Sequence, residues 1–242
     1  MSDVSQAPYD EAVVFGASGG IGAALVRSIA RSSTYRRVHA ISRRPLEPQE
    51  GILPHHYEPN ESGIAAVLDG LPLEKVGLVI VAIGTLHDES HGPEKSIQQF
   101  DSERFLDVMR VNAVLPTLIG KALMPLMKKR PLKFAALSAR VGSISDNRLG
   151  GWHSYRASKA ALNMLIRNIA IEAGRVNKEA IAVALHPGTV DTALSAPFQA
   201  NVPEGKLFEP DKAADCLVEV LAGLSPADSG KCFDYAGREI LP

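Results

Sequence analysis

A tyrosine and a lysine one helical turn apart are the side chains in this sequence best suited to acid–base chemistry. Tyr155 and Lys159 stand in the segment 154–174, whose periodicity predicts a helix, so both project from the same face. A phenol is a poor acid or base at neutral pH, because its pKa is about 10. A neighbouring ammonium favours the phenolate and lowers that pKa, so the pair predicts a general acid and base in one pocket.

A glycine-rich segment near the N-terminus predicts a dinucleotide site. Residues 16–22, GASGGIG, follow an apolar run and open a predicted helix. At such a junction glycines let the backbone turn tightly and approach a pyrophosphate at the helix N-terminus. The spacing here is GxxxGxG, and the predicted cofactor contacts in this loop are Gly16, Ser18, Gly20, Ile21 and Gly22.

The residues that end the second predicted strand indicate which dinucleotide binds. The chain reads Ser42-Arg43-Arg44 there, without the carboxylate that would bind the ribose hydroxyls of NAD. An arginine guanidinium can bind the 2′-phosphate of NADP through charge-assisted bidentate bonds, and Ser42 can donate one more. The sequence therefore predicts NADP(H) rather than NAD(H), with a solvated strand end as the alternative interpretation of the arginines.

The elements that must position these residues alternate between short apolar runs and longer segments of helical period. Strands that are apolar throughout are buried on both faces, as a parallel sheet between two layers of helices requires. We therefore predict a single α/β domain over residues 9–242, with a doubly wound, mostly parallel, Rossmann-like sheet. Residues 1–8 are polar and aperiodic and are predicted to be flexible. The predicted strands are 12–18, 37–43, 76–84, 133–139, 180–188 and 231–237, and the predicted helices are 20–33, 63–71, 102–129, 154–174 and 211–224.

Composition limits the partners to consider. A formal charge of −1 over 242 residues gives no electrostatic reason to expect a nucleic acid or an anionic membrane as partner. No apolar run approaches the roughly 18 residues of a membrane span, and no basic-then-apolar stretch opens the chain. Cys216 and Cys232 have no second pair and no histidine at ligand spacing. We therefore expect a reducing, cytoplasmic setting and no metal site.

An irregular segment, residues 192–210, lies between a predicted strand and the last predicted helix. A loop of this length in a compact domain is usually functional or mobile, so we interpret it as a substrate lid, with a passive insertion as the alternative. Trp152 and Phe198 are candidate apolar walls for a substrate with some hydrophobic body. His153, two residues before Tyr155, is a candidate for the mouth of the substrate pocket.

Taken together, the motifs resemble those of a known family. The loop 16–22, the Tyr155/Lys159 pair and the segment 187–192, PGTVDT, are similar in this order to the short-chain dehydrogenase/reductases, from about residue 10 to the C-terminus. Residues 138–163 resemble more narrowly the bacterial C-factor-like branch and its animal carbonyl-reductase relatives. The resemblance implies an NADP(H)-dependent enzyme that interconverts the carbonyl and alcohol of a small molecule. The alternative is a non-catalytic NADP-binding sensor or signalling protein of the C-factor type.

The resemblance also implies roles for individual residues. Tyr155 would exchange a proton with the substrate oxygen, and Lys159 would hold the nicotinamide ribose. Asn112 matches the helix asparagine that holds a water linking Lys159 to solvent. Self-association into a homodimer or homotetramer is implied through residues 102–129 and 154–174. The implied cofactor contacts in the second half of the site are Gly84, Tyr155, Lys159, Pro187, Gly188, Val190 and Thr192.

The sequence departs from the family pattern at two strand ends. The fifth predicted strand usually ends in two serines, of which the second polarises the carbonyl, and here it reads Ser138-Ala139. Ser138 could take the role if the strand end is rotated, because neighbouring side chains on a strand face opposite ways. Ser143, twelve residues before Tyr155, has nearly the usual spacing, so both serines stay open. The fourth predicted strand lacks the usual asparagines before Gly84, which we expect to affect stability more than chemistry.

Overall fold

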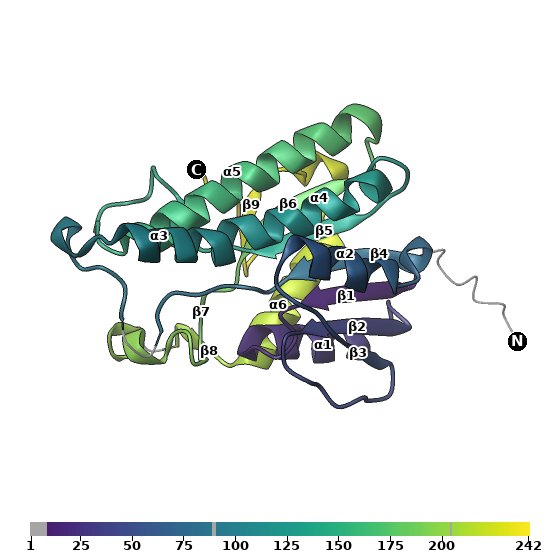
Figure 1. Cartoon of the computed structure of the whole chain (residues 1–242), viewed down its shortest axis with the longest axis horizontal. Helices are drawn as coiled ribbons and strands as arrows, with labels where there is room; N and C mark the ends of the chain where they lie inside the picture. The colour runs from purple at the N-terminus through teal and green to yellow at the C-terminus, as the bar shows by residue number, and fades with distance from the viewer. Residues whose placement is uncertain (1–8, 89–90, 204) are drawn as a thin grey trace, which may run out of the picture.

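The computed structural model describes residues 9–88, 91–203 and 205–242, so the segment 1–8 that we predicted to be flexible lies outside the described residues. A seven-stranded sheet, in the order β3-β2-β1-β4-β5-β6-β9 and parallel throughout, lies between two layers of helices (Figure 1). This order confirms the predicted single-domain α/β fold with a doubly wound, Rossmann-like sheet.

The elements match the predicted rhythm closely. The strands are β1 Glu11–Phe15, β2 Arg37–Ser42, β3 Ile52–His56, β4 Val76–Val81, β5 Lys133–Leu137, β6 Ile181–His186, β7 Thr189–Val190, β8 Leu207–Phe208 and β9 Cys232–Asp234. The helices are α1 Gly20–Arg31, α2 Glu61–Asp69, α3 Ser102–Met109, α4 Leu115–Met127, α5 His153–Val176 and α6 Pro210–Gly223. None of the helices within these described ranges is long and apolar enough to cross a membrane.

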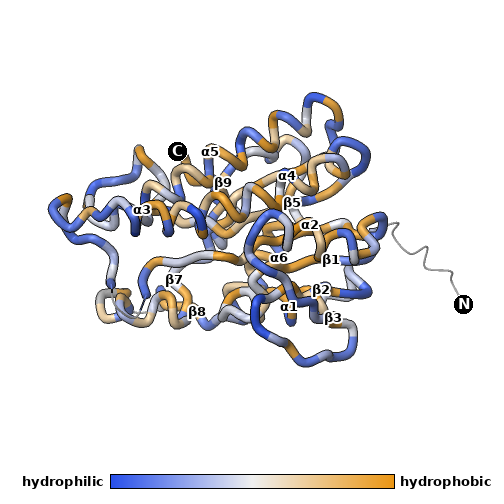
Figure 2. The backbone as a smooth tube through the Cα atoms, in the orientation of Figure 1, coloured by the Kyte–Doolittle hydropathy of each residue, from blue (hydrophilic) through white to orange (hydrophobic). Residues whose placement is uncertain are grey.

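Both faces of the sheet are covered, which explains why its strands are apolar throughout. Alternate residues of β1 enter different cores: Val13 packs with side chains of α2, α4 and α5, whereas Val14 packs with side chains of α1 and α6. Figure 2 shows the apolar residues gathered along the central strands and the polar residues on the connecting loops. With both faces covered, a ligand can enter only at an edge formed by the strand ends.

One strand of the large sheet was not predicted. β3 reads ILPHH, and a proline with two histidines does not match a buried, continuously apolar strand. The strand lies at the end of the sheet and pairs with β2 alone. An edge strand tolerates Pro54 because one side of its backbone has no neighbouring strand to bond.

The predicted single helix over residues 102–129 is interrupted at its centre. α3 and α4 are joined by a π-helical turn, Arg110–Val114, that contains Asn112. Pro116 has no N–H to donate to the carbonyl of Asn112 four residues earlier, so regular α-helical bonding cannot continue there. π-helical turns of this kind occur frequently at functional sites.

The predicted loop 192–210 carries more structure than expected. It contains a 3₁₀ segment, Ala196–Asn201, and the short strand β8, which pairs with β7 in a separate two-stranded sheet. The pairing ties the far end of the loop to the residues that directly follow β6, so the loop is anchored at both ends.

Candidate active site

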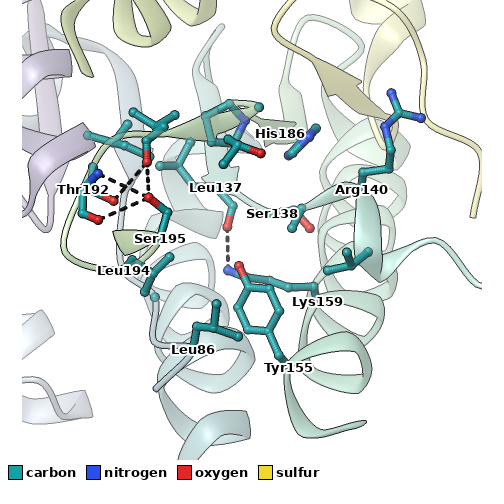
Figure 3. Close-up of a pocket in the computed structure, with 18 of the residues that line it drawn as sticks. Leu86, Leu137, Ser138, Arg140, Tyr155, Lys159, His186, Thr192, Leu194 and Ser195 are labelled. Atoms are coloured by element: carbon teal, nitrogen blue, oxygen red, sulfur yellow. Dashed lines mark hydrogen bonds between the residues drawn. The ribbon is translucent and has the colours of Figure 1, made fainter. Parts of the chain in front are cut away.

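A cavity of about 600 Å³ opens where the ends of the strands meet. Its lining brings together the glycine loop after β1, the ends of β4, β5 and β6, and the pair Tyr155 and Lys159. In Figure 3 both side chains extend from α5 toward the end of β5, and Thr192, Leu194 and Ser195 lie across the cavity from Tyr155. Segments that are far apart in the sequence therefore share one pocket, as the parallel sheet requires.

Tyr155 and Lys159 are both buried beside this cavity, at 8% and 3% exposure. The Lys159 ammonium lies 5.8 Å from the centre of the Tyr155 ring and donates a 2.9 Å hydrogen bond from Nζ to the Leu137 carbonyl. Burial raises the pKa of Tyr155 to about 12, and burial lowers the pKa of Lys159 to about 8. We expected the ammonium to lower the tyrosine pKa, and this was wrong for the structure, because desolvation of the phenol dominates.

The glycine loop is shaped by contacts that a side chain would block. A Cβ at Gly22 would lie 2.1 Å from the Gly16 carbonyl oxygen, and a Cβ at Gly16 would lie 2.6 Å from the Ala82 carbonyl oxygen. Gly16 also has a positive φ of 84°, which favours glycine. The loop therefore presents bare backbone to the cavity at the start of α1, and this geometry fits the phosphates of a dinucleotide.

The residues after β2 lie across this loop. Arg44 donates from Nη2 to the Ser18 carbonyl oxygen at 2.9 Å, and its Nε lies 3.4 Å from Ser18 Oγ. Ser42 is buried, and its hydroxyl oxygen accepts the Arg44 backbone N–H at 3.1 Å. Both Arg43 and Arg44 are exposed. The structure thus places Arg44 beside the predicted phosphate loop, while Ser42 supports the backbone beneath it.

Asn112 joins the end of β4 to α5. It is fully buried, accepts the Thr85 N–H at Oδ1 (2.7 Å), and donates from Nδ2 to the Thr85 carbonyl (2.8 Å) and Ser158 Oγ (3.0 Å). A Cβ at Gly84 would lie 3.5 Å from both Asn112 Oδ1 and Lys159 Nζ. Asn112 is therefore beside Lys159, at the π-helical turn.

The two candidate serines lie in different surroundings. Ser138 lines the cavity, and its hydroxyl donates a 2.7 Å hydrogen bond to Asn163 Oδ1. Ser143 is buried against Ser145 and the Asp146 N–H and is not among the described residues that line the cavity. Ala139 packs in a cluster with Leu86 and Tyr155. A methyl group therefore occupies the place beside the phenol where the family pattern has a serine.

The segment after β6 closes the cavity above the glycine loop. A Cβ at Gly20 would lie 2.6 Å from Thr192 Cγ2, so the two segments are in close contact. Gly188 has a φ of 80°, and a Cβ there would lie 2.8 Å from the ring of Phe208. Pro187, Gly188, Val190 and Thr192 all line the cavity, as do Ile21 and Gly84. Of the predicted cofactor residues, those from both halves of the sequence that line the cavity include Gly20, Gly22, Tyr155 and Lys159. The others, Gly16, Ser18, Ser42, Arg43 and Arg44, are not among the described residues that line it.

The far side of the cavity is apolar and aromatic. Trp152 and Phe198 line it as predicted, with ring centres 5.1 Å apart, and Leu86 and Leu194 pack with them. We call these four side chains the aromatic wall. Sequence reasoning missed the two leucines because nothing in their local pattern distinguishes them from core residues. His153 is not among the described residues that line the cavity.

Residues 60–203 match the profile of the short chain dehydrogenase family, so the chain belongs to that family. It is 36% identical over 132 residues to C-signal of Myxococcus xanthus, covering 54% of this chain and 74% of that protein. It is 35% identical over 134 residues to 1-hydroxy-2-glutathionyl-2-methyl-3-butene dehydrogenase of Rhodococcus sp. (strain AD45), covering 55% of this chain and 56% of that protein. The chain thus spans about half the length of that dehydrogenase.

The fold has close counterparts among solved structures. An NADPH-bound carbonyl reductase from chicken fatty liver superimposes with a TM-score of 0.83 at 24% identity, over 98% of this chain and 100% of that one. This likeness is one of fold. Within the described residues, no group of three or more His, Cys, Asp or Glu side chains is placed to hold a metal ion.

Proposed function

We propose that this chain is an NADP(H)-dependent oxidoreductase that interconverts a carbonyl and an alcohol, with Tyr155 as general acid and base. The observation that carries the proposal is the meeting of the Tyr155/Lys159 pair and the glycine loop in one cavity. A family of dehydrogenases and a fold shared with a carbonyl reductase support the same reaction class.

The residues that would hold the cofactor are those of the glycine loop, which presents its backbone, and Arg44, which supplies a positive charge. The glycine loop fits the pyrophosphate, and Arg44 beside Ser18 fits the 2′-phosphate of NADP, since arginines and no carboxylate come directly after β2. The NADPH found in the chicken carbonyl reductase supports this choice. When bound, NADPH supplies the hydride that adds to the carbonyl carbon.

The protein itself supplies the proton that the carbonyl oxygen receives. A phenol with a pKa of about 12 is fully protonated at neutral pH, so Tyr155 Oη can donate to the carbonyl oxygen during reduction. Lys159, with a pKa of about 8, keeps its positive charge at neutral pH and stabilises the phenolate that remains. Asn112 positions the backbone beside Lys159.

We propose Ser138 rather than Ser143 as the hydroxyl that assists Tyr155. Ser138 is the one that lines the cavity, whereas Ser143 bonds to the loop that follows it. The Ser138 hydroxyl must give up its hydrogen bond to Asn163 Oδ1 before it can donate to the substrate oxygen. We therefore expect Ser138 to accelerate the reaction less than a serine at position 139 would.

The test is to follow NADPH absorbance against a panel of aldehydes, ketones and diketones. Turnover that is abolished in Tyr155→Phe supports the proposal. Tight NADPH binding without turnover on any carbonyl would contradict it and would favour the alternative, a non-catalytic sensor or signalling protein. The similarity to C-signal supports that alternative, but an intact Tyr155/Lys159 pair makes it the less favoured one.

Self-association through the central helices is a further part of the proposal. Leu106 of α3 and Met164 and Ile171 of α5 are apolar side chains exposed at 58%, 61% and 44%. Met164 and Ile171 are seven residues apart and so share a helix face. We expect light scattering to give the mass of a dimer or tetramer, and a monomer would contradict this part.

A further inference from the structure

The turn that leads into α5 has a backbone conformation that bulky residues avoid. Gly150, Gly151 and Trp152 have consecutive φ values of 65°, 62° and 51°. The two glycines adopt this left-handed region freely. At Trp152, which has a ψ of 42°, the same conformation is sterically strained because the residue has a Cβ. Such a conformation persists only when surrounding contacts hold it.

Two residues hold the turn. Arg156 donates from Nε to the carbonyls of Gly150 (3.2 Å) and Gly151 (3.1 Å), and Glu94, on a segment about sixty positions earlier, holds the end at Trp152. The Glu94 carbonyl accepts the Trp152 N–H at 2.5 Å. Its carboxylate accepts the Ser154 N–H at 3.3 Å and also accepts the Ser154 hydroxyl. Glu94 therefore bonds to the last residue of the turn through its backbone and to the first turn of α5 through its side chain.

Glu94 carries a buried carboxylate that hydrogen bonds and the N-terminus of α5 stabilise. Its side chain is almost completely inaccessible, at 2% exposure. Burial is the largest single influence and raises its pKa, but the hydrogen bonds from Ser154 and from the Glu94 backbone N–H, with the positive charge of Arg104, together lower the pKa of Glu94. The negative charge lies at the N-terminus of α5, where unbonded N–H groups and the helix dipole favour it.

The turn 150–152 positions two parts of the site, the aromatic wall and Tyr155. The Trp152 ring packs edge-on against Tyr155, with ring centres 6.2 Å apart, and at a tilt against Phe198, with ring centres 5.1 Å apart. Tyr155 lies in the first turn of α5, directly after the residues that Glu94 bonds. Glu94 itself is not among the described residues that line the cavity, so any effect on chemistry must pass through Trp152 and Ser154.

We infer that Glu94 is a positioning residue that clamps the turn 150–152 and so sets both the aromatic wall and the start of α5. The inference rests on the proposed function and deepens it, because an apolar wall built from Trp152 and Phe198 fits a carbonyl compound that carries an aromatic ring. The substrate class is therefore aryl ketones and aldehydes in preference to small aliphatic ones.

Trp152 allows a test that does not depend on activity, because it is the single tryptophan of the chain. In Glu94→Gln we expect Trp152 emission to move to longer wavelength and acrylamide quenching to increase, as the ring leaves its packed position. Asp228→Asn is the matched control, since the Asp228 carboxylate also accepts a serine N–H (3.1 Å) and hydroxyl (2.8 Å), both from Ser225. We expect its emission to equal that of the wild type.

The second readout is the ratio of kcat/KM for an aryl ketone to kcat/KM for a small aliphatic ketone. Glu94→Gln should lower the aryl value by up to about 100-fold, the effect of a misplacement of about 1 Å, and lower the ratio. NADPH affinity should stay unchanged, and Glu94→Asp should recover part of the loss. Ser154→Ala removes one donor to Glu94 with little disturbance and should give a smaller change in the same direction.

The outcomes separate the two proposals. A shifted Trp152 emission in a chain that reduces no carbonyl would contradict the proposed function and leave the clamp standing. Unchanged emission and an unchanged substrate ratio in folded Glu94→Gln would overturn the clamp, whatever the activity. If Glu94→Gln does not fold, Ser154→Ala decides, and wild-type emission and ratio in that variant would overturn the inference.

Discussion

The two ends of the cavity are built in different ways. At the glycine loop, residues 16–22, the backbone sets the shape, and nearby carbonyl oxygens leave no room for a Cβ at Gly16 or Gly22. At the aromatic wall, side chains from three separate segments set the shape and are held by contacts such as those of Glu94. The glycine loop therefore tolerates few substitutions, whereas single substitutions in the aromatic wall can change which ligand binds there.

The largest expected effect on cofactor binding is at the glycine loop. Gly22→Ala would bring a Cβ to 2.1 Å from the Gly16 carbonyl oxygen, so the loop must shift. We expect NADPH affinity to fall about 100-fold, near the upper end of the roughly 1–3 kcal/mol that overpacking costs. Isothermal titration with NADPH checks this. Gly19→Ala is the control, because its Cβ would be at 3.4 Å from the same oxygen; equal losses would contradict a backbone-shaped loop.

The arginines after β2 come next. Replacing Arg43 and Arg44 with alanine should weaken NADPH about 10- to 100-fold, the range for hydrogen bonds to a charged group, and leave NADH nearly unchanged. The dissociation constants of both cofactors measure the effect. Arg44→Ala alone should account for most of it, since Arg44 is the one that contacts Ser18. Equal losses for NADPH and NADH would show that the arginines do not bind the 2′-phosphate.

The end of β5 sharpens the comparison, because there a single methyl group replaces the family serine. Ala139→Ser should raise kcat about tenfold, one donor at the carbonyl oxygen being worth about 1.4 kcal/mol or more. Ser138→Ala should lower kcat by less than that, and Ser143→Ala should change little. Steady-state kinetics on one ketone compares the three. A larger loss in Ser143→Ala than in Ser138→Ala would reverse our assignment.

The smallest effect is in the pH dependence. Lys159, with a pKa of about 8, is positively charged below that pH and neutral above it. Carbonyl reduction should therefore be constant between about pH 6 and 7 and decline above pH 8, while Tyr155 stays protonated throughout. The measurement is kcat/KM for reduction against pH, with Lys159→Met as control. The decline should be absent in that variant, and a decline of the same size would assign it elsewhere.

The sequence predicted the glycine end of the site better than the aromatic end. Gly16, Gly20 and Gly22 report a backbone requirement at the residue itself, so their spacing after a strand was enough to place the loop. The pairing of Tyr155 and Lys159 could also be predicted from the sequence, because a spacing of four residues places two side chains on the same face of a helix. The parallel sheet between two layers of helices was also predicted, because its strands are continuously apolar.

What the sequence did not reveal depends on contacts between distant residues. β3 was missed because an edge strand can include Pro54, which a local pattern counts against a strand. Glu94 was missed because its partners, Trp152 and Ser154, are some sixty positions away and no local motif joins them. The raised pKa of Tyr155 depends on burial, which the spacing of Tyr155 and Lys159 does not report.

The measurement that tests the central claim most directly is made on Tyr155→Phe, by NADPH titration followed by a single turnover with an aryl ketone. The variant lacks one hydroxyl and keeps the ring that packs against Trp152. We predict NADPH affinity equal to that of the wild type and a loss of about 1,000-fold in the rate of reduction, within the range for general acid catalysis. Retained reduction in Tyr155→Phe would contradict the assignment of Tyr155 as proton donor.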